Sequence, residues 1–366
     1  ASDVYKRQVK AAKVRQMRHE SGWSVMRECA VSMQRSRRRP FRLLAAASAA
    51  ACAIAVASCG SSEDSAPEQS QPSTAWTNDL GIPLSTPLVG PEPGHTKKMQ
   101  LASGRTFLLH VPEGYTPERS WPIILVFHGW NETIDSLEVN TGFSDSRAIV
   151  AYPQGVDGAW SPAPYAKTST DEDLQFVHDR VDGLRSTYRV NDNEIFAAGM
   201  SNGGGFAAFL ACRMPETFHS VATVSAAYYE GIHDGCTDRP VGRLDLHGTK
   251  DPVVSYDGGV RHETPYASVK EVLHEHERRN RCSGKVESVR LTNGAEKETW
   301  LGCEAPLQHI RIEGGSHIWP GGFNTRHMEV GPGFATDAVL DFFGIPGRPA
   351  NTKQEDATAS TTRQAP

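Results

Sequence analysis

The most informative segment of this 366-residue chain is IFAAGMSNGGGFAAFLAC, at residues 195–212. The apolar run IFAAG leads into Ser201, which stands within the pattern G-x-S-x-G, and the small-residue segment after it is typical of a buried helix. A strand, a sharp turn and a helix in this order hold a serine in a strained conformation at the carboxyl edge of a sheet. Because the chain contains 33 glycines, the pattern alone is weak, and its interpretation depends on the segments around it.

Short apolar runs alternate with helical patterns along the rest of the chain. Strands are predicted at residues 123–127, 148–152, 195–199, 221–225, 244–247 and 309–312, and helices at residues 171–188, 265–279 and 335–343. This alternation predicts an α/β fold with a doubly wound, mostly parallel sheet covered on both faces. Together with the strand, turn and helix around Ser201, it resembles the α/β-hydrolase fold. The segment between the strands that end near residue 225 and begin at residue 244 is short and polar, so no large cap domain is expected.

Two further residues are expected to make Ser201 reactive, since a serine hydroxyl needs a base that is itself oriented by an acid. In this fold the acid and then the histidine follow the serine along the chain. Asp251 comes directly after a predicted strand, where the catalytic groups of open α/β sheets collect, and Asp245 and Asp257 are the alternatives. His317 follows the last predicted strand. The sequence therefore predicts Ser201, Asp251 and His317 as the catalytic residues.

Other site residues are predicted from their positions beside the nucleophile. Two backbone N–H donors should stabilise an oxyanion. One is expected from Asn202 and the other from Trp130, in a loop that His128 braces. Trp130, Trp319 and Trp160 are candidate flat surfaces for an aryl or sugar group of a substrate. We expect no metal and no cofactor.

The N-terminal region is predicted to direct export. The segment DVYKRQ resembles the translation of an adapter used in sequencing libraries, so residues 1–32 are interpreted as non-native, with Met26 or Met33 as the start. Residues 33–58 combine a basic stretch with an apolar run that is short for a membrane span. They resemble a bacterial lipoprotein signal peptide. In that interpretation Cys59, the next residue, carries the lipid that anchors the protein to the outer face of the cell membrane. A secreted protein that is cut nearby is the alternative.

Two polar segments are predicted to flank one folded domain. Residues 59–96 are rich in Ser, Pro, Glu and Gln and are predicted to form a disordered tether, and residues 347–366 to form a disordered tail. The domain itself is expected over residues 97–346.

Four cysteines lie within the expected domain, an even number that fits disulfides in an exported protein. Three connectivities are possible. The sequential pairs Cys212–Cys236 and Cys282–Cys303 are favoured, because each closes a short local loop.

The charge distribution argues against a nucleic-acid partner. The first 58 residues carry 12 Lys and Arg against 3 Asp and Glu, while the whole chain has a net charge of −5, which leaves about −14 for the remainder. A strongly acidic mature protein is a poor candidate for binding phosphate backbones.

Five sequence blocks in order, LVFHGW, YPQG, GMSNGGG, HGTKDPV and GGSHIWPGG, resemble the polyhydroxybutyrate depolymerase and feruloyl esterase family of bacterial lipoproteins and secreted enzymes. The resemblance covers about residues 97–346. It implies an esterase with Ser201 as nucleophile, Asp251 as acid and His317 as base, and it agrees with two local disulfides. Ser316 stands where the family often has a second glycine.

The expected substrate is an ester carried on a polymer, because a hydrolase without a cap should have an open cleft. Feruloyl or acetyl esters on plant polysaccharide are expected first, and a polyhydroxybutyrate or other polyhydroxyalkanoate ester is the alternative. Further alternatives are a cell-envelope acyltransferase and a non-catalytic binding lipoprotein.

Overall fold

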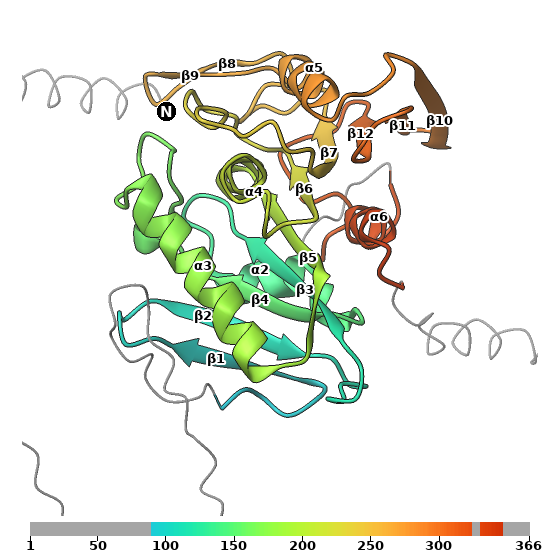
Figure 1. Cartoon of the computed structure of the whole chain (residues 1–366). Coiled ribbons are helices and arrows are strands. Elements are labelled where there is room, and N and C mark those ends of the chain that lie inside the picture. Colours follow the sequence, from blue (N-terminus) through green and yellow to red (C-terminus); the bar gives the residue numbers. More distant parts are fainter. Residues whose placement is uncertain (1–88, 324–329, 347–366) are drawn as a thin grey trace, which may run out of the picture. The chain divides into compact units, whose positions relative to one another are not determined.

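Strand β5 (Val190–Met200) lies between β3 (Trp121–Phe127) and β6 (Ser220–Val224) at the centre of the sheet (Figure 1). The computed structural model describes residues 89–323 and 330–346. The predicted leader, the predicted lipid site at Cys59 and the predicted C-terminal tail lie outside the described residues, as does most of the predicted tether.

The sheet has ten strands within the described residues, in the order β1-β2-β4-β3-β5-β6-β7-β12-β11-β10. The six inner strands pair in parallel, and they include β4 (Ile149–Pro153), β7 (Gly242–Gly248) and β12 (Leu307–Ile312). All six were predicted, and the mostly parallel α/β fold is confirmed.

Two antiparallel pairs at the edges of the sheet were not predicted. They are β1 (His95–Gln100) with β2 (Thr106–Val111) and β10 (Val286–Thr292) with β11 (Ala295–Trp300). The prediction relied on continuous apolar runs, which are typical of strands covered on both faces. Strand β10 is exposed along nearly its whole length, so its sequence carries no such run.

Helices cover both faces of the sheet (Figure 1). Helices α3 (Thr170–Thr187) and α4 (Asn202–Arg213) pack into the hydrophobic core on one face, and α2 (Ile134–Thr141) and α6 (Phe334–Phe343) into the core on the other. Short 3₁₀ turns occupy Phe143–Asp145 and Val156–Gly158. Among the described residues, no helix is both long enough and apolar enough to cross a membrane.

Helix α5 (Val269–Arg279) begins later than predicted. Its N-cap is Ser268, whose hydroxyl accepts the N–H of Glu271, while the Glu271 carboxylate accepts the N–H of Ser268. The preceding residues form strand β9 (Thr264–Tyr266), which pairs with β8 (Gly259–Arg261) in a separate two-stranded sheet. The helical prediction for residues 265–268 was therefore wrong.

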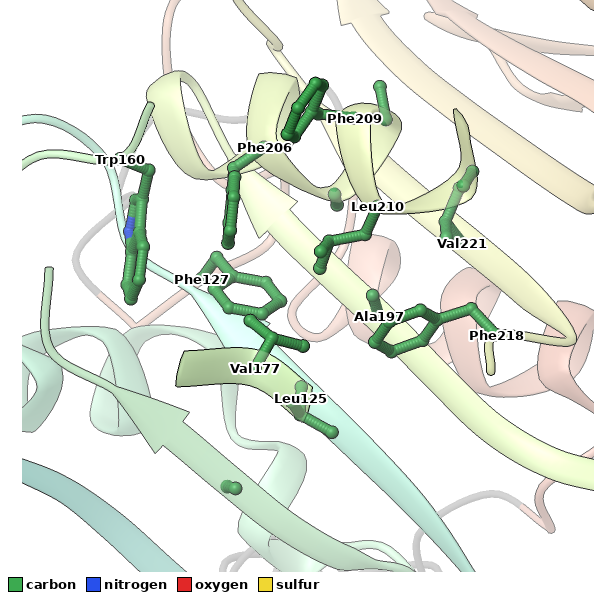
Figure 2. Packing of buried hydrophobic residues seen from close by; sticks show 14 of the residues in the cluster. Leu125, Phe127, Trp160, Val177, Ala197, Phe206, Phe209, Leu210, Phe218 and Val221 are labelled. Carbon is green, nitrogen blue, oxygen red and sulfur yellow. The ribbon is translucent and has the colours of Figure 1, made fainter. Parts of the chain in front are cut away.

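Aromatic side chains fill the core beneath α4 (Figure 2). The ring of Phe206 stacks on Trp160 with centroids 5.0 Å apart, and Phe127 meets Phe206 edge-on at the same separation. Trp160 is fully buried. The prediction that Trp160 offers a surface to a substrate was wrong, because its ring is part of the core.

The described residues contain the two predicted disulfides. Cys212–Cys236 joins the end of α4 to the loop before β7, and Cys282–Cys303 joins the residues after α5 to the loop after β11. Each closes a local loop, with sequence separations of 24 and 21 residues. Residues 225–241, between β6 and β7, contain no helix, which agrees with the absence of an inserted cap.

We predict that replacing both Cys212 and Cys236 with Ser lowers the free energy of unfolding by about 3 kcal/mol, because the unfolded chain gains the entropy of an open loop. Urea unfolding followed by tryptophan fluorescence measures the change. The Cys282→Ser/Cys303→Ser variant should lose a similar amount, since its loop has a similar length. An unchanged midpoint in both double variants would contradict the prediction.

Candidate active site

The candidate site lies at the carboxyl edge of the sheet, where the strand order changes direction. Strand β3 has β4 on one side and β5 on the other, so the loops after β3 and β5 diverge. Such a switch point leaves a crevice that open α/β sheets use for binding. Ser201 directly follows β5, and the loop containing Trp130 follows β3.

Ser201 occupies the turn between β5 and α4 with φ of 53° and ψ of −118°, which non-glycine residues rarely adopt. A Cβ at position 203 would lie 2.2 Å from the carbonyl oxygen of Phe127, and a Cβ at position 199 would lie 2.2 Å from that of Gly203. Both contacts are too short for any side chain, so both positions require glycine. The G-x-S-x-G pattern is thus a consequence of the close approach of α4 to two strands.

His317 contacts Asp251 across neighbouring strands. Asp251 follows β7 and His317 follows β12, and Nδ1 of His317 lies 2.7 Å from Oδ2 of Asp251. Because an ionised carboxylate can only accept, Nδ1 carries the donated proton. Nε2 of the neutral ring is then unprotonated and able to accept a proton. His317 and Ser201 line the same cavity, of about 380 Å³.

Asp251 is held in place from several directions. Its Oδ1 accepts the N–H groups of Val253 and Val254, each at 2.8 Å. Nε2 of the buried His247 donates to the carbonyl oxygen of Val254 at 2.9 Å and lies 3.5 Å from Oδ2 of Asp251. Burial alone would raise the pKa of Asp251, but hydrogen bonds with His247 and His317 hold that pKa below its usual value. The carboxylate therefore stays ionised. Sequence reasoning missed His247, because its place in an apolar strand indicated only a core position.

The two alternative aspartates lie elsewhere. Asp245 is buried in β7, where its Oδ1 accepts the hydroxyls of Thr223, at 2.8 Å, and of Tyr228. Asp257 is exposed. Of the three aspartates, Asp251 is the one that contacts His317.

His128 braces the loop after β3 as a neutral side chain. Its Nε2 accepts the N–H of Gly155 at 2.9 Å, so the ring proton is on Nδ1, which donates to the carbonyl oxygen of Gly129 at 2.7 Å. Burial lowers the pKa of His128 to about 4. The ring therefore remains uncharged near neutral pH.

The backbone N–H groups of Trp130 and Asn202 donate no hydrogen bond to any of the described residues. The side chain of Asn202 is fixed by the backbone of Trp160: its Oδ1 accepts the N–H at 2.8 Å, and its Nδ2 donates to the carbonyl oxygen at 3.0 Å. This pairing fixes the first residue of α4. Both N–H groups thus remain free for a ligand.

An aromatic rim, defined here as Trp130, Tyr165 and His262, lines the same cavity. The three rings contact one another, with centroids 4.7–5.0 Å apart, and Trp130 is 43% exposed. His262 stands at the tip of the β8–β9 hairpin, with φ of 53°. Sequence reasoning missed His262 because this hairpin turn contains no glycine.

Trp319 differs from the residues of the aromatic rim. It adjoins the cavity, but its ring is fully buried and its Nε1 donates to Oγ1 of Thr336 at 3.0 Å. The prediction that Trp319 offers a flat surface to a substrate was wrong, because its side chain anchors the loop after β12 to α6.

Glu132 is a further charged residue of the cavity that sequence reasoning missed. Its side chain is half-buried, and its Oε2 accepts the N–H of Gly129 at 3.0 Å. Burial raises its pKa above the usual value for a glutamate. Its position in a loop gave no indication of the direction of its side chain.

Histidines and carboxylates outside the cavity form pairs rather than metal sites. His276 lies 3.0 Å from guanidinium nitrogens of Arg243 and Arg279, and His309 lies 2.9 Å from Asp245. Throughout residues 89–323 and 330–346, no three or more His, Cys, Asp or Glu side chains are arranged to hold a metal ion.

Comparison with known proteins identifies relatives for most of the described chain. Residues 99–303 match the family described as Esterase, putative esterase. The feruloyl esterase C of Emericella nidulans is 27% identical over 272 residues, which cover 71% of this chain and 91% of that protein. The putative esterase NocK of Nocardia uniformis is 27% identical over 326 residues, which cover 80% of this chain and 93% of that protein. Among solved structures, an acetyl xylan esterase from Aspergillus awamori aligns with a TM-score of 0.49 and 15% identity, covering 68% of this chain and 99% of that one.

We predict that lowering the pH from 6.5 to 4 destabilises the fold, with a contribution of up to about 3 kcal/mol from His128. In the unfolded chain this histidine binds a proton below pH 6.5, whereas in the folded protein its pKa of about 4 keeps it neutral. Urea unfolding at several pH values should show a smaller loss of stability for His128→Asn than for the wild type. Parallel pH dependences of the two proteins would contradict this assignment.

Proposed function

The chain belongs to the putative esterase family, and from this membership we propose that it is an exported serine esterase whose nucleophile, base and acid are Ser201, His317 and Asp251. The observation that carries the proposal is the 2.7 Å hydrogen bond between His317 and Asp251, together with the cavity that Ser201 shares with His317. The strained turn at Ser201 supports it further.

In the proposed mechanism, Nε2 of His317 takes the proton of Ser201 as Oγ attacks the ester carbonyl. Asp251 keeps the ring in the required tautomer and stabilises the imidazolium ion that forms. The N–H groups of Trp130 and Asn202 donate to the oxyanion of the tetrahedral intermediate. The intermediate then expels the alcohol, which takes its proton from His317. A water molecule, activated by the same histidine, cleaves the acyl-enzyme and releases the acid.

The proposed substrates are feruloyl esters on plant polysaccharide, with acetyl esters next. Several curated relatives are named feruloyl esterases, and the aromatic rim offers flat surfaces against which an aromatic ring could pack. A polyhydroxybutyrate depolymerase is the alternative within the same mechanism.

Export and a lipid anchor at Cys59 belong to the same proposal. The two disulfides support export, because such bonds persist in oxidising compartments. Mass spectrometry of the mature N-terminus in a bacterial host tests the anchor. A diacylated Cys59 is expected, and an unmodified N-terminus further along the chain would contradict it.

We predict that Ser201→Ala lowers kcat by about 10,000-fold or more on both methyl ferulate and 4-nitrophenyl acetate, and that Asp251→Asn lowers it by about the same factor. A fluorophosphonate probe should label the wild type and not Ser201→Ala. Asp257→Asn is the matched control and should retain wild-type activity, since this aspartate is exposed and outside the cavity. Labelling that persists in Ser201→Ala would show that another residue is the nucleophile.

We predict that Trp130→Ala and His262→Ala each reduce kcat/KM for methyl ferulate by about 3- to 10-fold, the range expected for one lost aromatic contact. Activity on ethyl acetate should change little, because this ester has no aromatic ring in either its acyl or its alcohol part. Val260→Ala, an exposed position of the same hairpin outside the cavity, should preserve both activities.

A panel that includes acetylated xylan and polyhydroxybutyrate film separates the substrate classes. Turnover of the film without turnover of feruloyl or acetyl esters would favour the depolymerase. Formation of acylated sugar faster than free acid would favour the acyltransferase.

A further inference from the structure

The turn formed by residues 129–132 directly follows β3 and is closed by two hydrogen bonds. The N–H of Glu132 donates to the carbonyl oxygen of Gly129 at 3.2 Å. In the other direction, the N–H of Gly129 donates to Oε2 of Glu132 at 3.0 Å. The backbone and the side chain of Glu132 therefore both bind Gly129.

Gly129 controls the direction of the proposed oxyanion donor, because its carbonyl group and the N–H of Trp130 belong to one peptide unit. In a trans peptide these two groups point in opposite directions. The carbonyl oxygen of Gly129 is held by His128 at 2.7 Å and by the N–H of Glu132. As long as that carbonyl keeps these partners, the N–H of Trp130 points away from them.

Glycine is the residue whose backbone rotates most easily, so this peptide unit needs restraint on both sides. On the C-terminal side, the N–H of Asn131 donates to the carbonyl oxygen of Gly158 at 2.9 Å, and Asn131 has φ of 58°. On the N-terminal side, the restraint on the N–H of Gly129 is the carboxylate of Glu132. Without that carboxylate the carbonyl group of Gly129 keeps its two partners, but the N–H of Gly129 loses its acceptor, so the peptide unit is restrained less firmly.

The Glu132 carboxylate also lies close to the nucleophile. Oε2 of Glu132 and Cβ of Ser201 each lie 3.5 Å from the point that a Cβ of Gly129 would occupy. The two atoms can thus be separated by no more than twice that distance. Glu132, Ser201 and His317 all line the cavity.

We propose that Glu132 is a positioning residue for the oxyanion hole: its carboxylate holds Gly129 so that the N–H of Trp130 remains directed at the substrate. This inference rests on the proposed function, in which that N–H stabilises the oxyanion. Glu132 acts through the backbone of the loop and takes no proton from the substrate.

The test compares Glu132→Ala with Glu132→Gln on 4-nitrophenyl acetate. Glu132→Ala should lower kcat by about 10- to 100-fold, part of the loss expected when an oxyanion donor is removed, with KM changed less than about 3-fold. Glu132→Gln should recover most of the activity, since its amide oxygen can accept the same N–H. Glu132→Met, similar in length but without a comparable acceptor, is a second variant for the case that Glu132→Ala folds poorly. It should show the same loss of kcat.

Asp135→Asn is the matched control. Asp135 lies three residues further on, is exposed, and contacts Lys98 at 3.7 Å on the surface. This variant should keep the wild-type kcat and KM. Thermal unfolding of every variant checks that the fold is intact.

Three results would overturn the inference while leaving Ser201-dependent hydrolysis, and thus the proposed function, in place. The first is a wild-type kcat in folded Glu132→Ala and Glu132→Met. The second is a large rise in KM without loss of kcat, which would make Glu132 a substrate-binding residue. The third is equal loss in Glu132→Gln and Glu132→Ala, which would make its charge, rather than its hydrogen bond, the important property. Wild-type protein without Ser201-dependent hydrolysis would overturn the proposed function, and the inference would fall with it.

Discussion

Helix α4 approaches the carboxyl ends of β3 and β5 so closely that no side chain fits between them at positions 199 and 203. This approach places the positive end of the helix dipole beside Ser201 and forces the serine backbone into its strained conformation. It also brings Gly203, the second residue of α4, against the backbone of Phe127 and His128 at the end of β3. The side chain of Asn202 forms hydrogen bonds with the backbone of Trp160. The ring of Trp160 in turn packs in the core against Phe206 of α4 (Figure 2). The strain at the turn is thus supported by the packing beneath it.

The surroundings shift the pKa values of the titratable groups around the cavity in different directions. Burial would raise the pKa of Asp251, but hydrogen bonds with His247 and His317 hold that pKa below its usual value, so the carboxylate stays ionised. His128 is buried without a carboxylate partner, so it remains neutral and serves as a hydrogen-bonding brace. Glu132 receives one N–H bond, which does not offset the cost of burying its charge, so its pKa rises. Similar side chains along one edge of the sheet therefore differ in pKa because they differ in their partners.

The parts of the fold that were predicted correctly are those whose structure follows from the residues of one local segment. The inner strands are apolar on both faces, and the order of strand, glycine-flanked serine and helix sets the turn at Ser201. Strand β10, at one edge of the sheet, was not predicted. It is exposed, so its sequence lacks a continuous apolar run, and its extended conformation depends on pairing with β11. Trp160 and Trp319 were wrongly interpreted as surface residues, since an aromatic residue in a loop is buried or exposed according to contacts made elsewhere in the chain. Glu132 and His262 were missed for the same reason: the direction of a loop side chain is a tertiary property.

The chain between β7 and α5 carries Asp251 at one end and His262 at the tip of its hairpin. The base of this hairpin is fixed independently of the tip, since the N–H of Ala267 donates to the carbonyl oxygen of Tyr228 and the N–H of Glu230 to that of Pro265. Asp251, for its part, is held by Val253 and Val254 next to β7. Substitutions at the tip can therefore alter the wall of the cavity without moving the carboxylate. In evolutionary terms, the tip of the hairpin can vary while Asp251 is retained. Related proteins can therefore differ in the shape of the cavity wall and keep the same carboxylate.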